Sequence, residues 1–295
     1  MLQIVARFAF VAWSLCVLLI VLGAGAGALR GGEVLAFSQR EQIRLLDVQS
    51  GVVLTLRPNI PEGSLQPTWS PDGERLVFSA FISSGNIDLF TLAANGRDLQ
   101  RLTDASGYDQ SPSWSPDGGQ IVFASNREDG RTMRLYVMNA DGSEISRLLN
   151  FVDVVDLPDW SPASEHVVFE RYTPGPLVPI IHRVNADGSD LRELTLRADY
   201  ARMPDISPDG EQVLYVGNNA SLWLMDIDGS NKRELLRHDC GFGLRSPRWS
   251  LDGERIAYSA ACNGEWDLII YDVAQGTRQR IYSSDATLQY VSWRP

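Results

Sequence analysis

Residues 112–124, PSWSPDGGQIVFA, decide the fold, because the chain repeats this phrase at nearly regular intervals. Related phrases begin at Pro67, Pro158, Pro204 and Pro247, and a shortened copy, VSWRP, ends the chain. The tryptophan position of the phrase falls at 69, 114, 160, 206, 249 and 293, with isoleucine at 206. Successive copies are therefore 45, 46, 46, 43 and 44 residues apart. A fixed period of this size indicates a repeat architecture.

Each repeat predicts four short β-strands. In the copy that contains PSWSPDGG, an SPDG turn at 115–118 joins the tryptophan strand to an apolar strand over 120–124. Proline presets the first turn angle, and glycine accepts the left-handed conformation that leads the chain back into the ladder. A third strand over 133–139 reaches an ADGS turn at 140–143, and a closing strand over 145–149 follows. Four strands in each repeat are typical of a β-propeller blade.

The two ends of the chain complete each other. Residues 33–57 contain the second, third and fourth strands of a repeat, whereas the C-terminal YVSWRP supplies a tryptophan strand alone. Joined, they form one complete blade beside the five internal ones. We therefore predict an all-β, six-bladed β-propeller over residues 31–295, closed by pairing of its N- and C-terminal strands, because closure hides edge strands that would otherwise promote aggregation.

The phrase WSPDG, the apolar strand after it and the later DADGS-like turn resemble the TolB-type β-propeller repeat, which is related to WD-repeat blades. The resemblance covers nearly all of residues 33–295. It implies a propeller fold and, by family, periplasmic protein binding. The matching residues are structural ones, so the resemblance specifies the fold more closely than the function.

Residues 1–30 differ from the rest of the chain. Arg7 is followed by an uncharged, largely apolar run over 8–29. Small residues near its end, at positions 24, 26 and 28, match a secretory signal with an A-x-A-like cleavage site. The same run is long enough to span a bilayer as a hydrophobic helix. Signal and anchor both remain open, and either places the propeller outside the cytoplasm, with membrane contact only through residues 8–29 if they are uncleaved.

The charge balance argues against nucleic acid as a partner. The chain has a formal net charge of −11. Binding to DNA or RNA phosphates requires a basic surface that releases counterions.

The serines and aspartates of the repeat predict architecture and not catalysis. Ser113, Ser115 and Asp117 have counterparts in other repeats, whereas a catalytic residue is needed once. The sequence contains no G-x-S-x-G elbow, phosphate-binding loop or dinucleotide fingerprint. The histidines show no metal-ligand spacing; they are His166, His182 and His238. We therefore expect no catalytic constellation and no cofactor.

Two cysteines suggest a cross-link. Cys240 lies in the loop that enters the fifth internal repeat, and Cys262 ends the second strand of that repeat. Loops at these positions emerge on the same face of a propeller. A disulfide between them is therefore possible in an oxidising compartment.

The variable loops predict where a ligand would bind. They lie on the face opposite the SPDG and ADGS turns, and variable loops on a rigid scaffold are the usual location of binding sites. Residues at the start of the tryptophan strands should line the central mouth; these are Gln66, Asp109, Gln110, Asp156, Arg202, Arg245 and Tyr290. Aromatic neighbours include Tyr108 and Tyr200. The mixture of charge and aromatic surface suits a peptide or protein segment.

Two functional hypotheses follow. The first is a non-enzymatic, extracytoplasmic scaffold that binds a protein or peptide of the cell envelope. The second is a carbohydrate- or small-molecule-active site in the central mouth, for which Asp109 and Asp156 are the candidate acidic pair. Direct contact between these two carboxylates would favour the second hypothesis.

Overall fold

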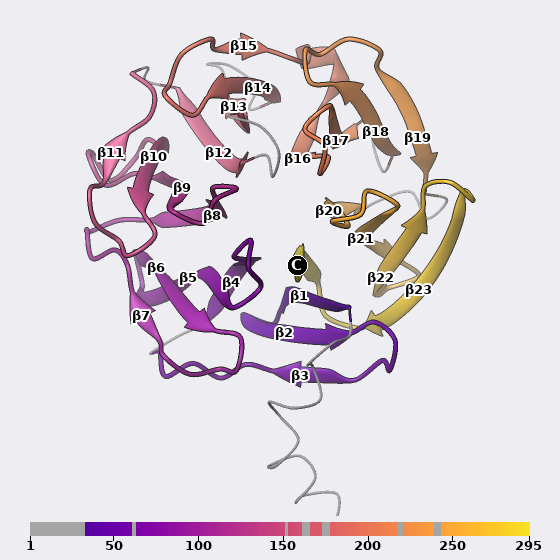
Figure 1. Cartoon of the computed structure of the whole chain (residues 1–295), viewed down its shortest axis with the longest axis horizontal. Coiled ribbons are helices and arrows are strands. Elements are labelled where there is room, and N and C mark those ends of the chain that lie inside the picture. Colours follow the sequence, from indigo (N-terminus) through magenta and orange to yellow (C-terminus); the bar gives the residue numbers. More distant parts are fainter. Residues whose placement is uncertain are drawn as a thin grey trace, which may run out of the picture.

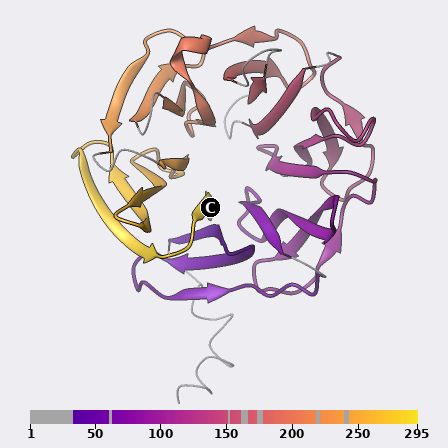
Figure 2. The same ribbon diagram turned by 180° about the vertical axis from the view of Figure 1, so that it is seen from behind.

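The computed structural model describes residues 33–60, 63–150, 153–160, 166–172, 178–217, 221–238 and 243–295. These residues form six four-stranded antiparallel sheets arranged as blades around a central axis (Figure 1). The same ring is seen from behind in Figure 2. The predicted all-β, six-bladed propeller is therefore confirmed. The hydrophobic helix predicted within residues 1–30 lies outside the described residues.

The described part of the chain holds no helix with the length and apolar character needed to cross a membrane.

The strands follow the predicted order within each blade. Blade 1 contains β4 (Ser64–Trp69), β5 (Arg75–Ser83), β6 (Asn86–Ala93) and β7 (Gln100–Arg101). Blade 2 contains β8 (Asp109–Trp114), β9 (Gln120–Ser125), β10 (Arg134–Asn139) and β11 (Ser146–Arg147). Blade 3 contains β12 (Val154–Trp160), β13 (His166–Tyr172), β14 (Pro179–Asn185) and β15 (Arg192–Glu193).

The remaining blades have the same plan. Blade 4 contains β16 (Arg202–Ile206), β17 (Gln212–Gly217), β18 (Ser221–Asp226) and β19 (Arg233–Arg237), preceded by the 3-10 helix η1 (Arg197–Asp199). Blade 5 contains β20 (Arg245–Trp249), β21 (Arg255–Cys262), β22 (Glu265–Asp272) and β23 (Thr277–Ser284). Blade 6 contains β24 (Leu288–Trp293), β1 (Val34–Gln39), β2 (Gln42–Asp47) and β3 (Val53–Thr55).

Blade 6 closes the ring as predicted. β24 pairs with β1 in antiparallel register, so that Trp293 lies opposite Leu35 and Ser292 opposite Ala36. The amide of Arg294 donates to the carbonyl oxygen of Val34 at 2.8 Å. Figure 1 shows β24 beside β1 near the axis, where the last strand of the chain takes the innermost place in this blade.

The hydrophobic core consists of six clusters, and each cluster joins two neighbouring blades. Trp114 of blade 2 packs with Val77 and Leu89 of blade 1 and with Ile121 of its own blade. The other tryptophans of the repeat occupy the same position, and Ile206 replaces tryptophan between blades 3 and 4. Because every cluster is shared, burial of apolar surface links the blades into one ring.

The SPDG turns account for the repeated serine and aspartate. Ser115 Oγ donates to Asp117 Oδ1 at 2.6 Å and accepts a hydrogen bond from the amide of Gln120 at 2.8 Å. Gly118 follows with φ +70°, a conformation that glycine adopts without strain. The hydrogen bond from Ser115 holds the pKa of Asp117 below its usual value. Blades 1, 4 and 5 repeat the serine-to-aspartate bond. These side chains therefore form the turn, as the sequence predicted.

Two faces of the ring follow from this arrangement. The turns that join the first to the second strand and the third to the fourth strand lie on one side, which we call the turn face. The loops that enter each blade and those that join the second to the third strand lie on the other side, which we call the loop face. The innermost strands run from the loop face to the turn face.

Each innermost strand contains a β-bulge at the same position. One non-glycine residue in each strand has φ between 48° and 56°; these residues are Gln66, Ser111, Leu157, Met203, Ser246 and Tyr290. The strand register shifts at this point in all six blades. A bulge leaves one residue unpaired and redirects the neighbouring side chains. The six bulges surround the central channel.

Candidate functional site

The bulges are tied together around the channel. The backbone amide of each bulge residue donates to a side chain, and five of the six acceptors belong to the preceding blade. These bonds are Gln66 to Ser38 Oγ (3.1 Å), Ser111 to Gln66 Oε1 (2.9 Å), Met203 to Glu170 Oε1 (2.6 Å), Ser246 to Met203 Sδ (3.2 Å) and Tyr290 to Ser246 Oγ (2.8 Å). The Leu157 amide instead donates to Asp156 of its own blade at 2.8 Å. Side chains are thus fixed where the channel opens to the loop face.

A polar network joins blades 1, 2 and 3 at the mouth. Gln110 Nε2 donates to Asp156 Oδ2 at 3.0 Å, and Ser111 Oγ donates to Asp156 Oδ1 at 2.7 Å. Gln66 Nε2 in turn donates to Ser111 Oγ at 2.9 Å. Burial raises the pKa of Asp156, and the bond from Ser111 acts in the opposite direction. The structure therefore brings together the predicted residues Gln66, Gln110 and Asp156 and adds Ser111, which the sequence interpretation had missed.

Glu170 is a second residue that the sequence interpretation missed. It lies on β13 and is 1% exposed. Its carboxyl group accepts hydrogen bonds from the Met203 amide and from the Tyr172 hydroxyl. Desolvation raises the pKa of Glu170 to about 7, although the hydrogen bonds and the positive charge of Arg202 lower it. An acidic residue inside the apolar segment HVVFERY was the available signal.

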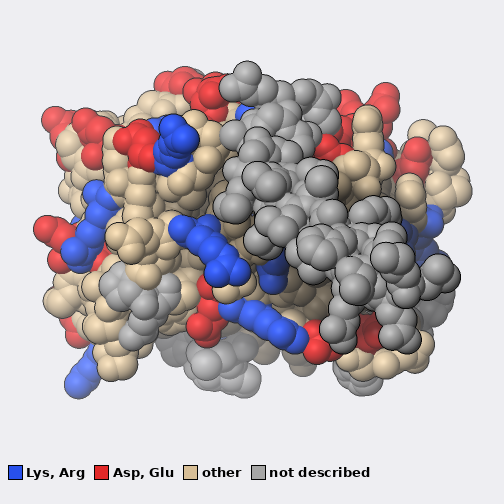
Figure 3. All heavy atoms as spheres, turned by 90° about the horizontal axis from the view of Figure 1, so that it is seen from below, with Lys and Arg blue, Asp and Glu red and all other residues tan. Residues whose placement is uncertain are grey.

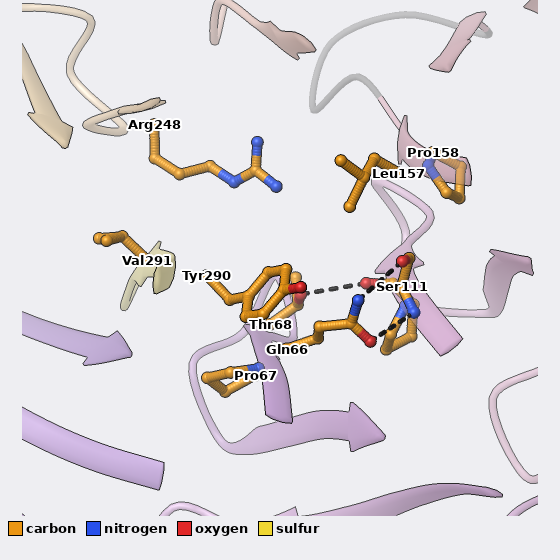
Figure 4. Close-up of a pocket in the computed structure, with 10 residues that line it drawn as sticks. Gln66, Pro67, Thr68, Ser111, Leu157, Pro158, Arg248, Tyr290 and Val291 are labelled. Atoms are coloured by element: carbon orange, nitrogen blue, oxygen red, sulfur yellow. Dashed lines mark hydrogen bonds between the residues drawn. The ribbon is translucent and has the colours of Figure 1, made fainter. Parts of the chain in front are cut away.

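The channel is narrow on the loop-face side. Figure 4 shows Gln66 directed toward Ser111, with Tyr290 beside it and Arg248 extending toward Leu157 across the axis. The cavity that these residues line has a volume of about 30 Å³. This is close to the volume of one water molecule. Among the described residues, this end of the channel therefore offers a small polar cavity.

Other predicted mouth residues have different partners. Asp109 is 1% exposed, accepts a hydrogen bond from Ser125 and forms an ion pair with Arg127 at 2.9 Å. The Arg245 guanidinium lies 5.4 Å from the ring centre of Trp266. Asp109 and Asp156 thus belong to separate hydrogen-bond networks, because Asp109 is turned into blade 2. The acidic pair of the enzymatic hypothesis is not formed.

Exposed apolar side chains gather on the loop face. Among the described residues, seven large hydrophobic side chains are exposed. Four of these precede or begin the inner strands of blades 2, 3 and 4; we call them the apolar arc, and they are Tyr108 (38%), Val154 (36%), Leu196 (62%) and Tyr200 (57%). The other three, Val52, Leu191 and Leu251, lie in turns of the opposite face. The predicted aromatic residues Tyr108 and Tyr200 are thus two of the four exposed large apolar side chains that the described residues place on the loop face.

One of the two cysteines of the predicted disulfide lies among the described residues. Cys262, at the end of β21, is disulfide-bonded. Cys240 lies outside the described residues, so the pairing of these two cysteines stays a prediction.

A larger cavity opens on the turn face. It has a volume of about 260 Å³ and lies at the axis of the ring. The residues that precede the tryptophan positions line it. Three of these residues are charged, namely Asp159, Asp205 and Arg248. Thr68 and Arg248 also line the small cavity on the loop-face side. The sequence interpretation assigned the positions before tryptophan to turn formation and missed this cavity.

Charges on the outer wall are mixed. Figure 3 shows basic and acidic side chains interspersed on the described part of this side of the ring. Surface pairs include Arg40 with Asp285 at 2.8 Å and Arg75 with Asp98 at 2.6 Å. A mixed wall lacks the continuous basic surface that nucleic-acid phosphates require.

Comparison with known proteins identifies the repeat. The family model described as the TolB beta propeller domain matches residues 34–241. TolB from Acinetobacter baumannii is similar in structure, with a TM-score of 0.76 at 18% sequence identity, over 90% of this chain and 67% of that chain. At this identity the structural likeness concerns the fold.

Enzyme propellers are similar as well. The hydrazine synthase of Kuenenia stuttgartiensis has a TM-score of 0.75 at 15% identity, over 89% of this chain and 46% of that chain. Oligogalacturonate lyase from Vibrio parahaemolyticus has a TM-score of 0.59 at 15% identity, over 81% of this chain and 70% of that chain. The same scaffold therefore carries different functions, and the function has to be argued from the site.

Proposed function

The chain belongs to the TolB β-propeller family, and from this premise we propose that it is a non-enzymatic, extracytoplasmic scaffold that binds a protein or peptide segment of the cell envelope through its loop face. The apolar run over residues 8–29 supports the extracytoplasmic location, because it suits a secretory signal or an anchor.

The apolar arc is the observation that carries the proposal. Its four side chains expose apolar surface over three consecutive blades, next to the polar network of Gln110 and Asp156. Protein interfaces combine aromatic side chains at the centre with polar groups at the rim. Single exposed apolar residues are common on any surface, but a grouping on one face indicates an interaction site.

The mouth suits a partner that lies on the surface. The cavity that the described mouth residues line is only about 30 Å³, so the proposed partner contacts chiefly the polar rim and the apolar arc. Hydrogen bonds from Gln110 and Ser111 hold the Asp156 carboxylate in place before any partner binds. Such preorganisation reduces the entropy lost on association.

The enzymatic alternative has less support from the geometry. It required Asp109 and Asp156 to act as a pair, but Asp109 pairs with Arg127 within blade 2. Glu170 has a pKa of about 7, which suits acid–base chemistry. It is nevertheless 1% exposed, and both of its carboxyl oxygens accept hydrogen bonds within the protein. A substrate therefore has no access to it in this conformation.

Site-specific photo-crosslinking tests the proposal. A photoreactive phenylalanine analogue at Tyr108 or Tyr200 should form a specific cross-link to an envelope protein in intact cells. The same analogue at Leu191 or Val52, which are exposed on the turn face, is the control. Cross-linking that is equal at all four positions, or confined to the turn face, would reject the loop face as the binding surface.

The location requires a separate experiment. Alkaline phosphatase fused after Pro295 is active only outside the cytoplasm, so the fusion should be active with residues 1–30 present and inactive when they are removed. Activity that does not depend on residues 1–30 would contradict the assigned role of this segment.

A further inference from the structure

The cavity on the turn face is built by one position of the repeat. Its axial wall contains the residue that precedes the tryptophan position in each of the six inner strands; these residues are Thr68, Ser113, Asp159, Asp205, Arg248 and Ser292. Side chains at this position also hold the neighbouring strand. The Trp160 amide donates to Ser113 Oγ at 3.1 Å, and the Trp69 amide donates to Ser292 Oγ at 3.2 Å.

The charges in this wall do not balance. Arg248 Nη1 lies 3.2 Å from Asp205 Oδ1. The other carboxyl oxygen of Asp205 accepts a hydrogen bond from the Trp249 amide at 2.6 Å. Asp159 Oδ2 accepts the Ile206 amide at 3.0 Å. Arg248 thus forms an ion pair with Asp205 and acts on Asp159 through its charge alone, while the positions contributed by β4, β8 and β24 are uncharged hydroxyl residues. A second positive charge in the cavity would allow both carboxyl groups to ionise together.

The rest of the cavity suits a long side chain with a charged end. Its wall includes the five tryptophans of the repeat; these are Trp69, Trp114, Trp160, Trp249 and Trp293. A lining that combines tryptophans with charged groups suits a side chain that buries methylene groups and carries its charge at the tip. The volume of about 260 Å³ is sufficient for one such side chain.

A groove leads outward from the cavity. It has a volume of about 570 Å³, lies between blades 1 and 2, and shares Pro71 and Trp114 with the axial cavity. Its wall contains three carboxylates, Asp72, Asp117 and Asp141, and one basic residue, Arg75, which is already paired with Asp98. The groove gives room for a peptide backbone that continues away from the axis.

The turns of blades 1, 2, 3 and 4 each place at least one aspartate on the turn face. Hydrogen bonds from neighbouring serines are the main cause that lowers the pKa of six turn aspartates; these are Asp72, Asp117, Asp141, Asp187, Asp209 and Asp228. They are therefore ionised at neutral pH. Negative charge around a cleft raises the local concentration of cationic ligands.

We propose that the turn-face cavity binds the ammonium or guanidinium end of a lysine or arginine side chain, presented by a protein segment that lies in the groove between blades 1 and 2. This site is distinct from the loop-face surface of the proposed function, because its lining includes turn residues of the opposite face, namely Pro71, Pro116 and Leu251. A metal ion is a less suitable occupant, since the described residues contain no group of three or more histidine, cysteine or acidic side chains placed to hold one.

Proton linkage follows from the same geometry. Desolvation raises the pKa of Asp205 to about 8 and also raises the pKa of Asp159, while Arg248 lowers both. A bound cation favours the ionised carboxylates, so binding below this pKa must release a proton. Affinity for the cationic side chain should therefore increase as the pH rises through about 8.

Titration of the purified full-length chain with acetyl-Gly-Lys-Gly-amide tests the proposal. Binding is followed by the indole NMR signals of the tryptophans, and the norleucine peptide serves as the uncharged control. We expect the lysine peptide to bind at least about tenfold more tightly than the norleucine peptide. Equal affinity of the two peptides would overturn the proposal.

Two variants of equal charge separate the cavity from the acidic surface. Asp159→Asn keeps an oxygen acceptor for the Ile206 amide and leaves the Arg248–Asp205 pair intact. It should weaken lysine-peptide binding about tenfold. Asp187 lies in the turn between β14 and β15 and lines neither the cavity nor the groove. Asp187→Asn should therefore have little effect on lysine-peptide binding. Equal losses in the two variants would show that binding is a general electrostatic effect and would overturn the cavity site, whether or not loop-face cross-linking succeeds.

A free monoamine tests the groove. n-Butylamine carries one ammonium group on four carbons, as the lysine side chain does, but has no peptide backbone. It should bind more weakly than the lysine peptide. Binding of n-butylamine that equals or exceeds that of the peptide would overturn the assignment to a protein segment.

Discussion

Tyr200 combines surface exposure with backbone strain. It is 57% exposed, and it has φ +48° where it caps the C-terminal end of η1. The left-handed conformation costs a non-glycine residue about 1–2 kcal/mol. Strained residues persist where surrounding structure holds them, and they are concentrated at functional sites. An exposed aromatic ring at a strained position is therefore consistent with a binding role in the apolar arc.

Two substitutions of Tyr200 separate the effect of its exposed ring from the effect of its backbone strain. Tyr200→Gly removes the strain and should stabilise the protein by about 1 kcal/mol, whereas Tyr200→Ala retains the strain. Both changes remove the ring and should reduce cross-linking from Tyr108. Denaturant unfolding measures the stability, and a glycine variant no more stable than the alanine variant would contradict the strain argument.

Glu170 makes the stability depend on pH. Its pKa is raised from 4.5 to about 7 in the folded protein, mainly by desolvation. The folded state therefore holds the proton more tightly than the unfolded state. This contribution to stability is complete below about pH 4.5 and is lost as the pH rises to about 7.

Glu170→Gln should remove this dependence. Glutamine keeps an oxygen acceptor for the Met203 amide and remains neutral at every pH. The variant should therefore gain stability relative to the wild type by up to about 3 kcal/mol between the acidic limit and neutral pH. Denaturant unfolding at a series of pH values measures the difference in free energy of unfolding between the variant and the wild type. A difference that does not change with pH would show that the pKa of Glu170 is the same in the folded and unfolded states.

At the scale of elements, the inner strands are joined by their bulges. A bulge would leave a backbone amide without a ladder partner, and an unsatisfied buried amide is costly. Side chains from the preceding blade accept five of the six bulge amides, so each of these strands is held by its neighbour. The bulges thus add directional contacts to the shared hydrophobic clusters.

Gln66→Ala tests the role of the bulge bonds. Gln66 Oε1 accepts the Ser111 amide at 2.9 Å and the Ser79 hydroxyl at 2.6 Å. Loss of this acceptor leaves buried donors without a partner and should cost about 2 kcal/mol. Gln100→Ala, on the exposed strand β7, is the matched control and should stay within about 0.5 kcal/mol of the wild type. Equal effects on the free energy of unfolding would mean that the inter-blade bond contributes little.

At the scale of the whole molecule, the repeat predicted the fold because each copy has the same turn chemistry. The SPDG turns and the pairing of residues 33–57 with the C-terminal strand were both predicted correctly. These features depend on local turn preferences and on burial, which the residue types encode directly.

The site was only partly predictable. Gln110 and Asp156, both predicted to line the mouth, are hydrogen-bonded to each other, a contact that the sequence did not predict, and Asp109 turns into its own blade. The bulges interrupt the alternation of side chains along the inner strands, so sequence spacing could not show which residue faces the channel. The sequence interpretation also gave no site role to Asp205 and Arg248, although they meet across two inner strands and line the axial cavity.

Both proposed sites depend on a closed ring, and native-state hydrogen exchange of β1 (Val34–Gln39) and β24 (Leu288–Trp293) tests closure most directly. We predict that the amides of these two strands are as protected as those of β8 and open in the same denaturant-dependent step. Exchange of the β24 amides at the rate of an unstructured peptide, while β8 stays protected, would contradict the closed six-bladed ring.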